Sequence, residues 1–296
     1  TGTGRKRWTM RWKAALQAFD ITFDGRLTAG RQRTKPPEFH RSLHRPARLS
    51  CCSGTEAIVK RRPPPCTEYV RTREERTAVS TLVLIDDERI ATMPVKDCGE
   101  PLVDLRPVPW LEVDDRQADA GGHYARVRTG VRERLRTATR ALPAGYRLVI
   151  VEGYRSPELQ RRYFDEHTAL LGARRPTWSA RQVHDAAVRY VSPPEVAPHT
   201  TGGAVDVTLR GPDGDLCWMG TEVYASPEES DGACYTDAGN VHDEGRAHRR
   251  VLVDALTTAG FVNYPTEWWH WSYGDRYWAV VTGAAYAVNG PLSQAT

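Results

Sequence analysis

The chain has 296 residues, of which 40% are hydrophobic, so it is long enough to bury the core of one or two domains. Its net charge of +4 hides an uneven distribution: residues 1–78 carry 18 Lys and Arg against 7 Asp and Glu, whereas the remainder carries 23 against 30. This split predicts a basic N-terminal arm ahead of an acidic domain. No apolar run approaches the roughly 18 residues of a membrane span, and the basic N-terminus lacks the apolar core of a signal peptide. We therefore expect a cytoplasmic protein without a membrane partner.

The six cysteines are scattered, and none forms a C-x-x-C pair. This spacing does not indicate a small disulfide-linked scaffold. It favours free thiols in a reducing compartment.

Residues 1–78 combine basic runs with prolines and show little apolar periodicity, a composition typical of disorder. One alternative is a nucleic-acid-binding arm, but no known nucleic-acid-binding motif supports it. We favour a third interpretation, in which this segment is upstream sequence translated from a mis-set start and the native protein begins at Val79 or Met93. The expected domain then spans residues 79–282, and residues 283–296 are expected to be a C-terminal tail.

Hydrophobic periodicity and turn residues predict alternating strands and helices in the domain. In chain order we expect strands or extended segments at 82–85, 94–105, 146–151, 204–209, 216–219, 261–264 and 267–271, and helices at 124–142, 157–167, 179–190 and 243–259. Ser156 is the expected N-cap of the helix that opens at Pro157, and Asp243 is the expected cap of the last helix. The 17 residues 225–241 are rich in Gly, Ser and acids, which is typical of a lid or binding loop.

His199, Asp206 and His270 form the candidate metal site, because two imidazoles and a carboxylate suit Zn²⁺ with one coordination position left open. Gly202 and the glycine that follows it permit a sharp turn between the first two residues. Alternation along 204–209 places Asp206 on the face opposite the valines. Each residue alone is more often an ordinary surface group. The joint pattern, with Glu267 three residues before His270, favours a metal with an acid beside its water.

The pattern H-x-x-G-x-A-V-D, which ends at Asp206, and the later E-W-W-H-W around His270 resemble the zinc D-Ala-D-Ala dipeptidases of the VanX type. That family lies in a wider group of D,D-carboxypeptidases and peptidoglycan endopeptidases. The resemblance extends from about Thr81 to Tyr277 and includes the motifs at 98–105, 152–157 and 219–221. Several separated motifs in the same order make a specific signal.

The resemblance implies an α+β fold, a mainly antiparallel sheet with flanking helices of the Hedgehog and D,D-peptidase type. It implies one Zn²⁺ per chain, bound by the three residues named above, and Glu267 as the general base and acid. The matching arginine, Arg155, is expected to hydrogen-bond the scissile carbonyl oxygen and stabilise the developing oxyanion. The alternative for Arg155 is an ion pair with Glu152 or Asp165.

For the substrate pocket, the resemblance implies that 219–221 lines the dipeptide site and that 94–105 is either a cleft wall or a plain edge strand. Tyr224 stands where the family has an aspartate that holds the substrate ammonium, and Ala197 stands where it has a serine. Glu222, Glu228 or Glu229 could replace the aspartate. We assign substrate contacts to Tyr224, Glu222 and Trp268, and the tryptophans around His270 are also expected to be core residues that keep the site dry.

These observations favour zinc-dependent hydrolysis of D-Ala-D-Ala or related short D-amino-acid dipeptides, with no nucleic-acid partner. Two alternatives stay open: a D,D-carboxypeptidase acting on peptidoglycan stem peptides, and a non-catalytic zinc-binding module. The presence of both Glu267 and Arg155 argues against the second, because a structural zinc site needs neither.

Overall fold

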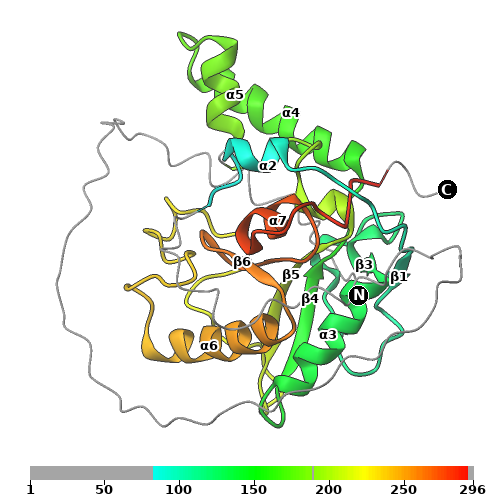
Figure 1. Ribbon diagram of the computed structural model, residues 1–296. Coiled ribbons are helices and arrows are strands. Elements are labelled where there is room, and N and C mark those ends of the chain that lie inside the picture. Colours follow the sequence, from blue (N-terminus) through cyan, green and yellow to red (C-terminus); the bar gives the residue numbers. More distant parts are fainter. Residues whose placement is uncertain (1–82, 189, 293–296) are drawn as a thin grey trace, which may run out of the picture.

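A five-stranded sheet in the order β2-β4-β5-β7-β6 forms the centre of the computed structural model, which describes residues 83–188 and 190–292 (Figure 1). Its neighbours pair antiparallel except β2 and β4, which are parallel. A separate two-stranded sheet pairs β1 with β3. The strands are β1 (Leu102–Asp104), β2 (Glu112–Val113), β3 (Arg126–Arg128), β4 (Arg147–Glu152), β5 (Ala204–Arg210), β6 (Val262–Tyr264) and β7 (Glu267–Ser272). The expected α+β fold with a mainly antiparallel sheet is confirmed.

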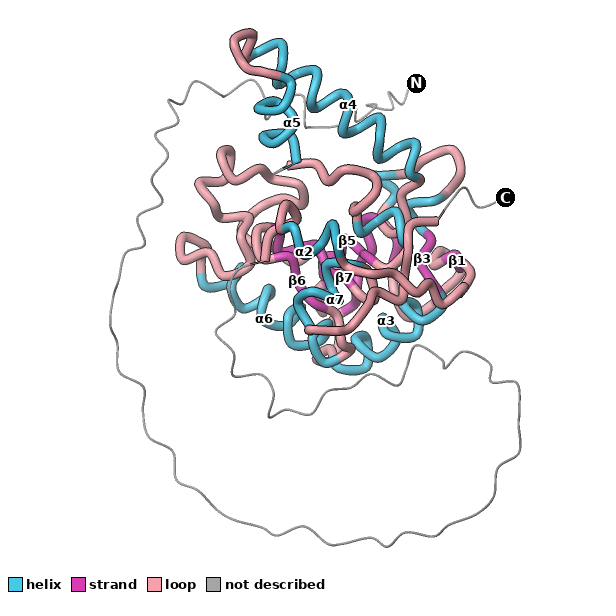
Figure 2. Tube along the Cα trace, turned by 45° about the horizontal axis from the view of Figure 1, so that its top comes forward, coloured by secondary structure: helices cyan, strands magenta, loops and turns pink. Residues whose placement is uncertain are grey.

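Helices lie on both sides of this sheet. In Figure 2, α3 and α6 lie along one side, and the hairpin of α4 and α5 projects from the other. The α-helices are α2 (Glu88–Thr92), α3 (Thr129–Ala141), α4 (Pro157–Arg174), α5 (Ala180–Val188), α6 (Asp243–Thr258) and α7 (Arg276–Thr282), and 3-10 turns occur at Asp115–Gln117, His123–Ala125 and Pro198–Thr201. No helix in the described part of the chain is both long and apolar enough to cross a membrane.

The main core lies between the sheet and the pair α3 and α6. Alternation along β5 turns Val205, Val207 and Leu209 into this core, where they join apolar residues of both helices such as Leu135 and Leu252. Burying each such side chain contributes roughly 1.5–3 kcal/mol to folding. Residues of β5 on the opposite face are also buried, so this strand is covered on both sides.

Three predicted elements differ from the structure: one is absent and two have other boundaries. The expected strand at 82–85 is absent from its described part, where Leu84 accepts a turn hydrogen bond from the Asp87 amide and Ile85 packs against Ile90 and Tyr277. The helix expected at 124–142 begins only at Thr129, because residues 126–128 pair with β1. The helix expected to end near residue 167 continues to Arg174, although its predicted Ser156 cap is confirmed.

Two predictions around the last helix and the hairpin also need correction. His242, not Asp243, occupies the N-cap of α6, and it makes no side-chain cap hydrogen bond; Asp243 pairs with Arg246 instead. The turn at 211–214 reverses the chain as expected, but the return is a single bridge between Arg210 and Leu216 and not a strand. Residues 225–241 form turns without helix or strand, as expected for a loop.

Residues 283–292, expected to be tail, pack against the domain. Ala287 donates its amide to the Pro94 carbonyl at 2.8 Å, and Leu292 donates to the Thr200 carbonyl at 2.9 Å. The predictions for the basic arm and its disorder fall outside the described residues, and the start site stays a prediction. Within the described part, Cys98, Cys217 and Cys234 are free thiols, as expected.

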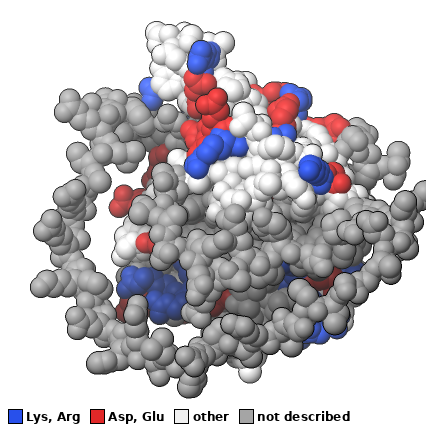
Figure 3. Space-filling model, viewed as in Figure 1, with Lys and Arg blue, Asp and Glu red and all other residues white. Residues whose placement is uncertain are grey.

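The exposed surface of α4 and α5 carries mixed charge. Acidic and basic side chains alternate there in Figure 3. Arg161 pairs with Glu195, and Arg181 lies 3.7 Å from Asp185 in an exposed i,i+4 pair. These are solvated ion pairs of small energetic value, and they do not form a single-sign binding patch.

Candidate active site

Strand register aligns three polar residues in one row across the sheet. Glu152 of β4 is the register partner of Asp206 in β5, and Asp206 is the partner of His270 in β7. Side chains at paired positions of neighbouring strands lie on the same face. The row therefore places two carboxylates and an imidazole side by side on the face that looks away from α3 and α6.

His199 reaches this row from the 3-10 turn Pro198–Thr201, which is closed by Gly202 in a left-handed conformation (φ 67°). A Cβ on Gly202 would lie 2.6 Å from Cδ2 of Leu102, so no other residue fits without movement. The Nδ1 atom of His199 lies 2.7 Å from the Gly153 carbonyl, which accepts its proton. The other ring nitrogen, Nε2, is thereby left with its lone pair facing the row.

The three candidate ligands converge on one point. Nε2 of His199 lies 3.1 Å from Nδ1 of His270 and 3.4 Å from Oδ1 of Asp206, and the remaining pair is 3.1 Å apart. Tetrahedral zinc with bonds of about 2.0–2.1 Å separates its donors by about 3.3 Å. Donor types and spacings therefore fit a divalent cation. All three side chains are buried, and although burial raises the pKa of Asp206, His199 and His270 together hold it well below its usual range.

Arg155 follows β4 and lies beside this cluster. Its Nε donates to Oε1 of Glu152 at 2.8 Å, a second nitrogen contacts Oε2, and Nη1 donates to Gln160 at 2.7 Å. The ion pair that was the alternative for Arg155 is thus present. Burial works against its charge, but Glu152 outweighs this effect and raises the pKa of Arg155, so it is a permanent cation.

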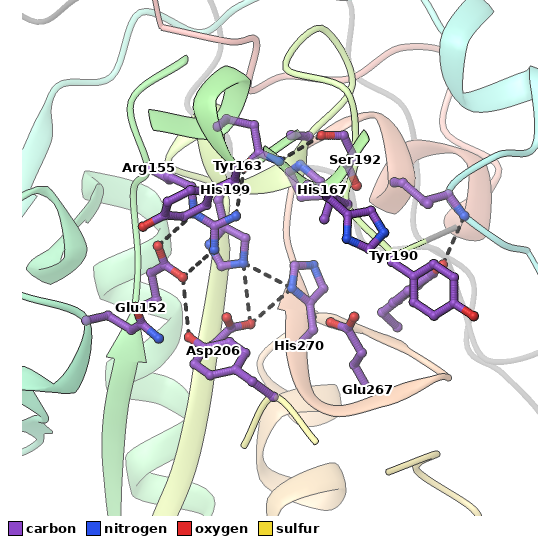
Figure 4. Close-up of a pocket in the computed structure, with 18 of the residues that line it drawn as sticks. Glu152, Arg155, Tyr163, His167, Tyr190, Ser192, His199, Asp206, Glu267 and His270 are labelled. Carbon is purple, nitrogen blue, oxygen red and sulfur yellow. Dashed lines mark hydrogen bonds and ion pairs between the residues drawn. The ribbon is translucent and has the colours of Figure 1, made fainter. Parts of the chain in front are cut away.

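Glu267 begins β7 and points into the same space as His270 (Figure 4). Burial raises the pKa of its carboxyl from 4.5 to about 7; Asp206 adds to this shift, and His270 and Arg155 oppose it. A carboxyl that titrates near neutral pH can both accept and donate a proton there.

Tyr224 adopts a left-handed backbone conformation (φ 67°), which is rare for a residue with a side chain. Its hydroxyl donates to Oε2 of Glu152 at 3.3 Å, and its ring packs edge-on against Trp269. Burial, with Asp206 and Glu152 adding to it, raises the pKa of this phenol well above its ordinary value, so the hydroxyl stays protonated as a donor.

Comparison with known proteins identifies the family. Residues 124–286 match the family model of the M15 peptidases, described as D-Ala-D-Ala dipeptidase. A D-alanyl-D-alanine dipeptidase of Synechocystis sp. is 30% identical over 218 residues, which cover 63% of this chain and 87% of the relative. The chain belongs to the M15 family of D-Ala-D-Ala dipeptidases. It is therefore a peptidase.

Solved structures resemble this M15 peptidase more distantly. VanYB in complex with D-alanine-D-alanine is 21% identical, with 56% of this chain and 80% of the other covered and a TM-score of 0.33. The LD-carboxypeptidase LdcB is 22% identical, with 64% and 77% covered and a TM-score of 0.37.

One pocket of this M15 peptidase contains the cluster, and it brings together most of the predicted site residues. The pocket is lined by Glu152, Arg155, His199, Asp206, Tyr224, Glu267 and His270, together with Ala197 and aromatic residues of other segments. Figure 4 shows the imidazoles, Asp206 and Glu267 turned toward one another, with Glu152 and Arg155 beside them.

Other expected pocket residues lie elsewhere. Trp268 is buried in the core and donates its indole N–H to Thr221 at 2.8 Å, and Glu222 is exposed; neither lines the pocket. No residue of 219–221 or of 94–105 lines the pocket. Met219 is buried in the core, and residues 102–104 form β1, which pairs with β3. The expected substrate contacts of Glu222 and Trp268 and the cleft-wall interpretation of 94–105 do not match these positions. Trp268, Trp269 and Trp271 are buried, as expected of core residues.

Sequence reasoning missed one wall of the pocket. Gln160, Tyr163 and His167 of α4 line it, and so do Tyr190 and Tyr264. The three α4 residues recur at intervals of three and four, which is the spacing of one helix face. Mixed polar and aromatic side chains at that spacing were the signal available in the sequence.

Proposed function

We propose that this peptidase is a zinc-dependent D,D-dipeptidase that hydrolyses D-Ala-D-Ala or a related short D-amino-acid dipeptide. The observation that carries the proposal is the convergence of His199, Asp206 and His270, whose three donor atoms lie 3.1–3.4 Å from one another inside a pocket. Two imidazoles and one carboxylate are the donor set of a catalytic zinc site, which keeps a coordination position open.

His199, Asp206 and His270 would bind one zinc ion. When bound, zinc supplies Lewis acidity, which polarises a carbonyl and lowers the pKa of water toward about 7. A buried set of ligands suits this task, because the same charges interact more strongly in a dry pocket than in water.

Glu267 is assigned the proton transfers. It accepts a proton from the attacking water and delivers it to the leaving amine of the dipeptide, so that the group returns to its starting state. The position of Glu267 in the pocket and its pKa of about 7 support this role, since one carboxyl must act first as base and then as acid.

Arg155 is assigned the scissile carbonyl oxygen. Its guanidinium is held on two sides, by Glu152 and by Gln160, and therefore stays in place as negative charge develops on that oxygen. Glu152 thus orients Arg155 in the proposed site, which makes the ion pair compatible with catalysis. The phenol of Tyr224, beside Glu152, is assigned a substrate contact.

A panel of dipeptides tests the proposal. Zinc-loaded protein is incubated with D-Ala-D-Ala, D-Ala-L-Ala, L-Ala-D-Ala, L-Ala-L-Ala and N-acetyl-D-Ala-D-Ala, and release of free alanine is measured. We expect hydrolysis of the D,D-dipeptide with a free amine, no hydrolysis after chelation, and recovery on adding zinc. Preference for the acetylated substrate would instead favour a carboxypeptidase.

The matched variant is Glu267→Gln, which keeps the size and hydrogen-bonding shape of the side chain but cannot shuttle a proton. We expect kcat to fall by at least about 10²-fold with zinc content unchanged. Near-full turnover by this variant would refute the assignment of Glu267. Failure of the zinc-loaded, unmodified protein to cleave any D,D-dipeptide would refute the proposed reaction.

A further inference from the structure

The two ring nitrogens of His270 face different surroundings. Nδ1 faces the candidate ligand cluster, where it lies 3.1 Å from Asp206 Oδ1. Nε2 faces the other way and lies 3.4 Å from Oγ of Ser272. Ser272 stands two residues further along β7, so the alternation of the strand puts both side chains on one face.

Three residues after Ser272 stands a buried carboxylate, Asp275, which is only 1% exposed. Its Oδ1 accepts the Trp278 amide at 2.9 Å and caps α7. Its Oδ2 is enclosed and has no partner at ordinary hydrogen-bonding distance among the described residues. Burial raises the pKa of Asp275, and the Trp278 amide and the Ser272 hydroxyl oppose that rise, which is consistent with a position of Ser272 near this carboxylate.

We propose that Ser272 and Asp275 are positioning residues for the metal ligand His270. The Nε2–H of His270 donates to Oγ of Ser272, whose own proton is donated to Asp275. This inference rests on the proposed zinc site and adds to it the groups that orient one of its ligands.

The direction of the chain follows from the number of protons. A neutral imidazole carries one N–H, and placing it on Nε2 leaves the Nδ1 lone pair facing Asp206 and His199. Ser272 can accept from His270 only through a lone pair, which frees its hydroxyl proton for an acceptor. Asp275, whose enclosed Oδ2 has no partner among the described residues, is the proposed acceptor.

Capping alone does not account for an aspartate at position 275. Asn and Ser cap helices about as well as Asp does, whereas a buried carboxylate costs free energy unless it is hydrogen-bonded. Only one oxygen of Asp275 serves the helix. The other oxygen is left as an acceptor for Ser272, and a hydrogen bond there would fix the hydroxyl that orients the ligand.

His199 is oriented by a hydrogen bond to the backbone and not to a side chain. Its outer nitrogen donates to a backbone carbonyl, that of Gly153, at 2.7 Å. Substitution of a side chain cannot remove that acceptor. Of the two imidazole ligands, His270 alone is oriented by a side chain, so it is the one whose support can be tested by mutation.

The test is the zinc affinity of the full-length protein, measured by competition with a chromophoric chelator. We expect Ser272→Ala and Asp275→Asn each to weaken zinc binding by about 10- to 100-fold. The zinc affinity of the double variant should equal that of the single variant with the lower affinity, because both residues belong to one chain of hydrogen bonds. Ser272→Thr keeps the hydroxyl and should bind like the unmodified protein.

Two controls separate positioning from folding. Asp275→Asn keeps an oxygen for the Trp278 amide, so the melting temperature of the metal-free protein should change little. Thr282→Ala removes a hydroxyl at the opposite end of α7, where it donates to Trp278, and should leave zinc affinity unchanged. Nitrogen-resolved NMR of the zinc-loaded, unmodified protein should find the His270 proton on Nε2, a readout that needs no variant.

The proposal is overturned if Ser272→Ala and Asp275→Asn bind zinc as tightly as the unmodified protein, or if NMR places the proton on Nδ1. If neither variant folds, the NMR result decides. If the unmodified protein binds zinc and cleaves D,D-dipeptide, and the variants bind zinc equally well, only this inference is refuted. If the unmodified protein binds no zinc, both this inference and the proposed function are refuted.

Discussion

Asp206 and His270 are direct register partners across β5 and β7, and Nδ1 of His270 lies 3.1 Å from Oδ1 of Asp206. Backbone hydrogen bonds of the sheet therefore hold two of the three proposed ligands at a fixed spacing. His199 depends on a separate element, the turn closed by Gly202. Rigid strands and a constrained turn together preorganise the proposed site.

Replacing Asp206 with Asn should abolish stoichiometric zinc binding. The substitution keeps the shape of the side chain but removes the only anionic ligand of the proposed set. We expect zinc content near zero after dialysis and loss of dipeptide hydrolysis. Asp254→Asn, on the exposed face of α6, is the matched control and should retain both. Full zinc occupancy in the Asp206 variant would contradict the ligand assignment.

Gly202→Ala should displace His199. An alanine there would be strained at φ 67°, and its Cβ would meet Leu102 at 2.6 Å. We expect unfolding free energy to fall by about 1–3 kcal/mol and zinc affinity to fall with it. Gly239→Ala lies in open space and should change neither. Equal zinc affinity in the two alanine variants would show that the turn does not constrain His199.

The metal-free protein should reveal the raised pKa of the partly buried acid Glu267. Its pKa is raised from 4.5 to about 7, so the folded state is penalised for ionising it as pH rises through that range. Glu267→Gln removes the penalty. The unfolding free energy of the variant minus that of the unmodified protein should increase with pH and level off above about pH 7. The total increase from pH 4.5 should be about 1–3 kcal/mol. Urea unfolding with chelator present measures this difference, and a difference that does not vary with pH would contradict the shifted pKa.

Arg155→Ala should impair both catalysis and folding. Loss of the proposed oxyanion donor should lower kcat/KM by about 2–4 kcal/mol of transition-state binding. The buried carboxylate of Glu152 would also lose its cation, which should cost about 3–5 kcal/mol of stability. Adding Glu152→Gln should restore much of the stability and none of the activity. Activity that recovered together with stability would mean that Arg155 acts only as an ion-pair partner.

Removing residues 1–78 should leave zinc binding and hydrolysis unchanged. Every described residue that lines the pocket lies at position 85 or later, and the core is built from residues 85–287. The truncated and full-length proteins are compared in kcat/KM and zinc stoichiometry. Loss of either property on truncation would assign a role in the site to the basic segment.

Local elements could be predicted well because their signals are local. The run of apolar residues in β4 and the Ser-Pro pair at Ser156 define a strand and a capped helix without reference to the rest of the chain. Boundaries failed where distant residues compete. Residues 126–128 continue the helical period of α3, but they pair with β1 because that strand needs a partner.

The candidate site was only partly predictable for the same reason. The spacing of His199 and Asp206 and the motif around His270 indicated a ligand set, but side-chain direction decided the pocket. Trp268 belongs to the same motif and yet turns into the core, where its indole donates to Thr221. No known motif predicted that Gln160, Tyr163 and His167 of α4 line the pocket, because a helix face lines a pocket only after the helix has packed.

Residue types, short periods and motif order are properties of the chain itself, and they determined the fold class, the family and the set of candidate groups. The tertiary structure alone decided that Glu152, Asp206 and His270 share one row, that Arg155 is held by Glu152, and that Ser272 faces Nε2 of His270. These relations depend on strand register, where a shift of one residue turns every side chain to the other face. Register is set by the packing of the whole domain, so it cannot be read from any one segment.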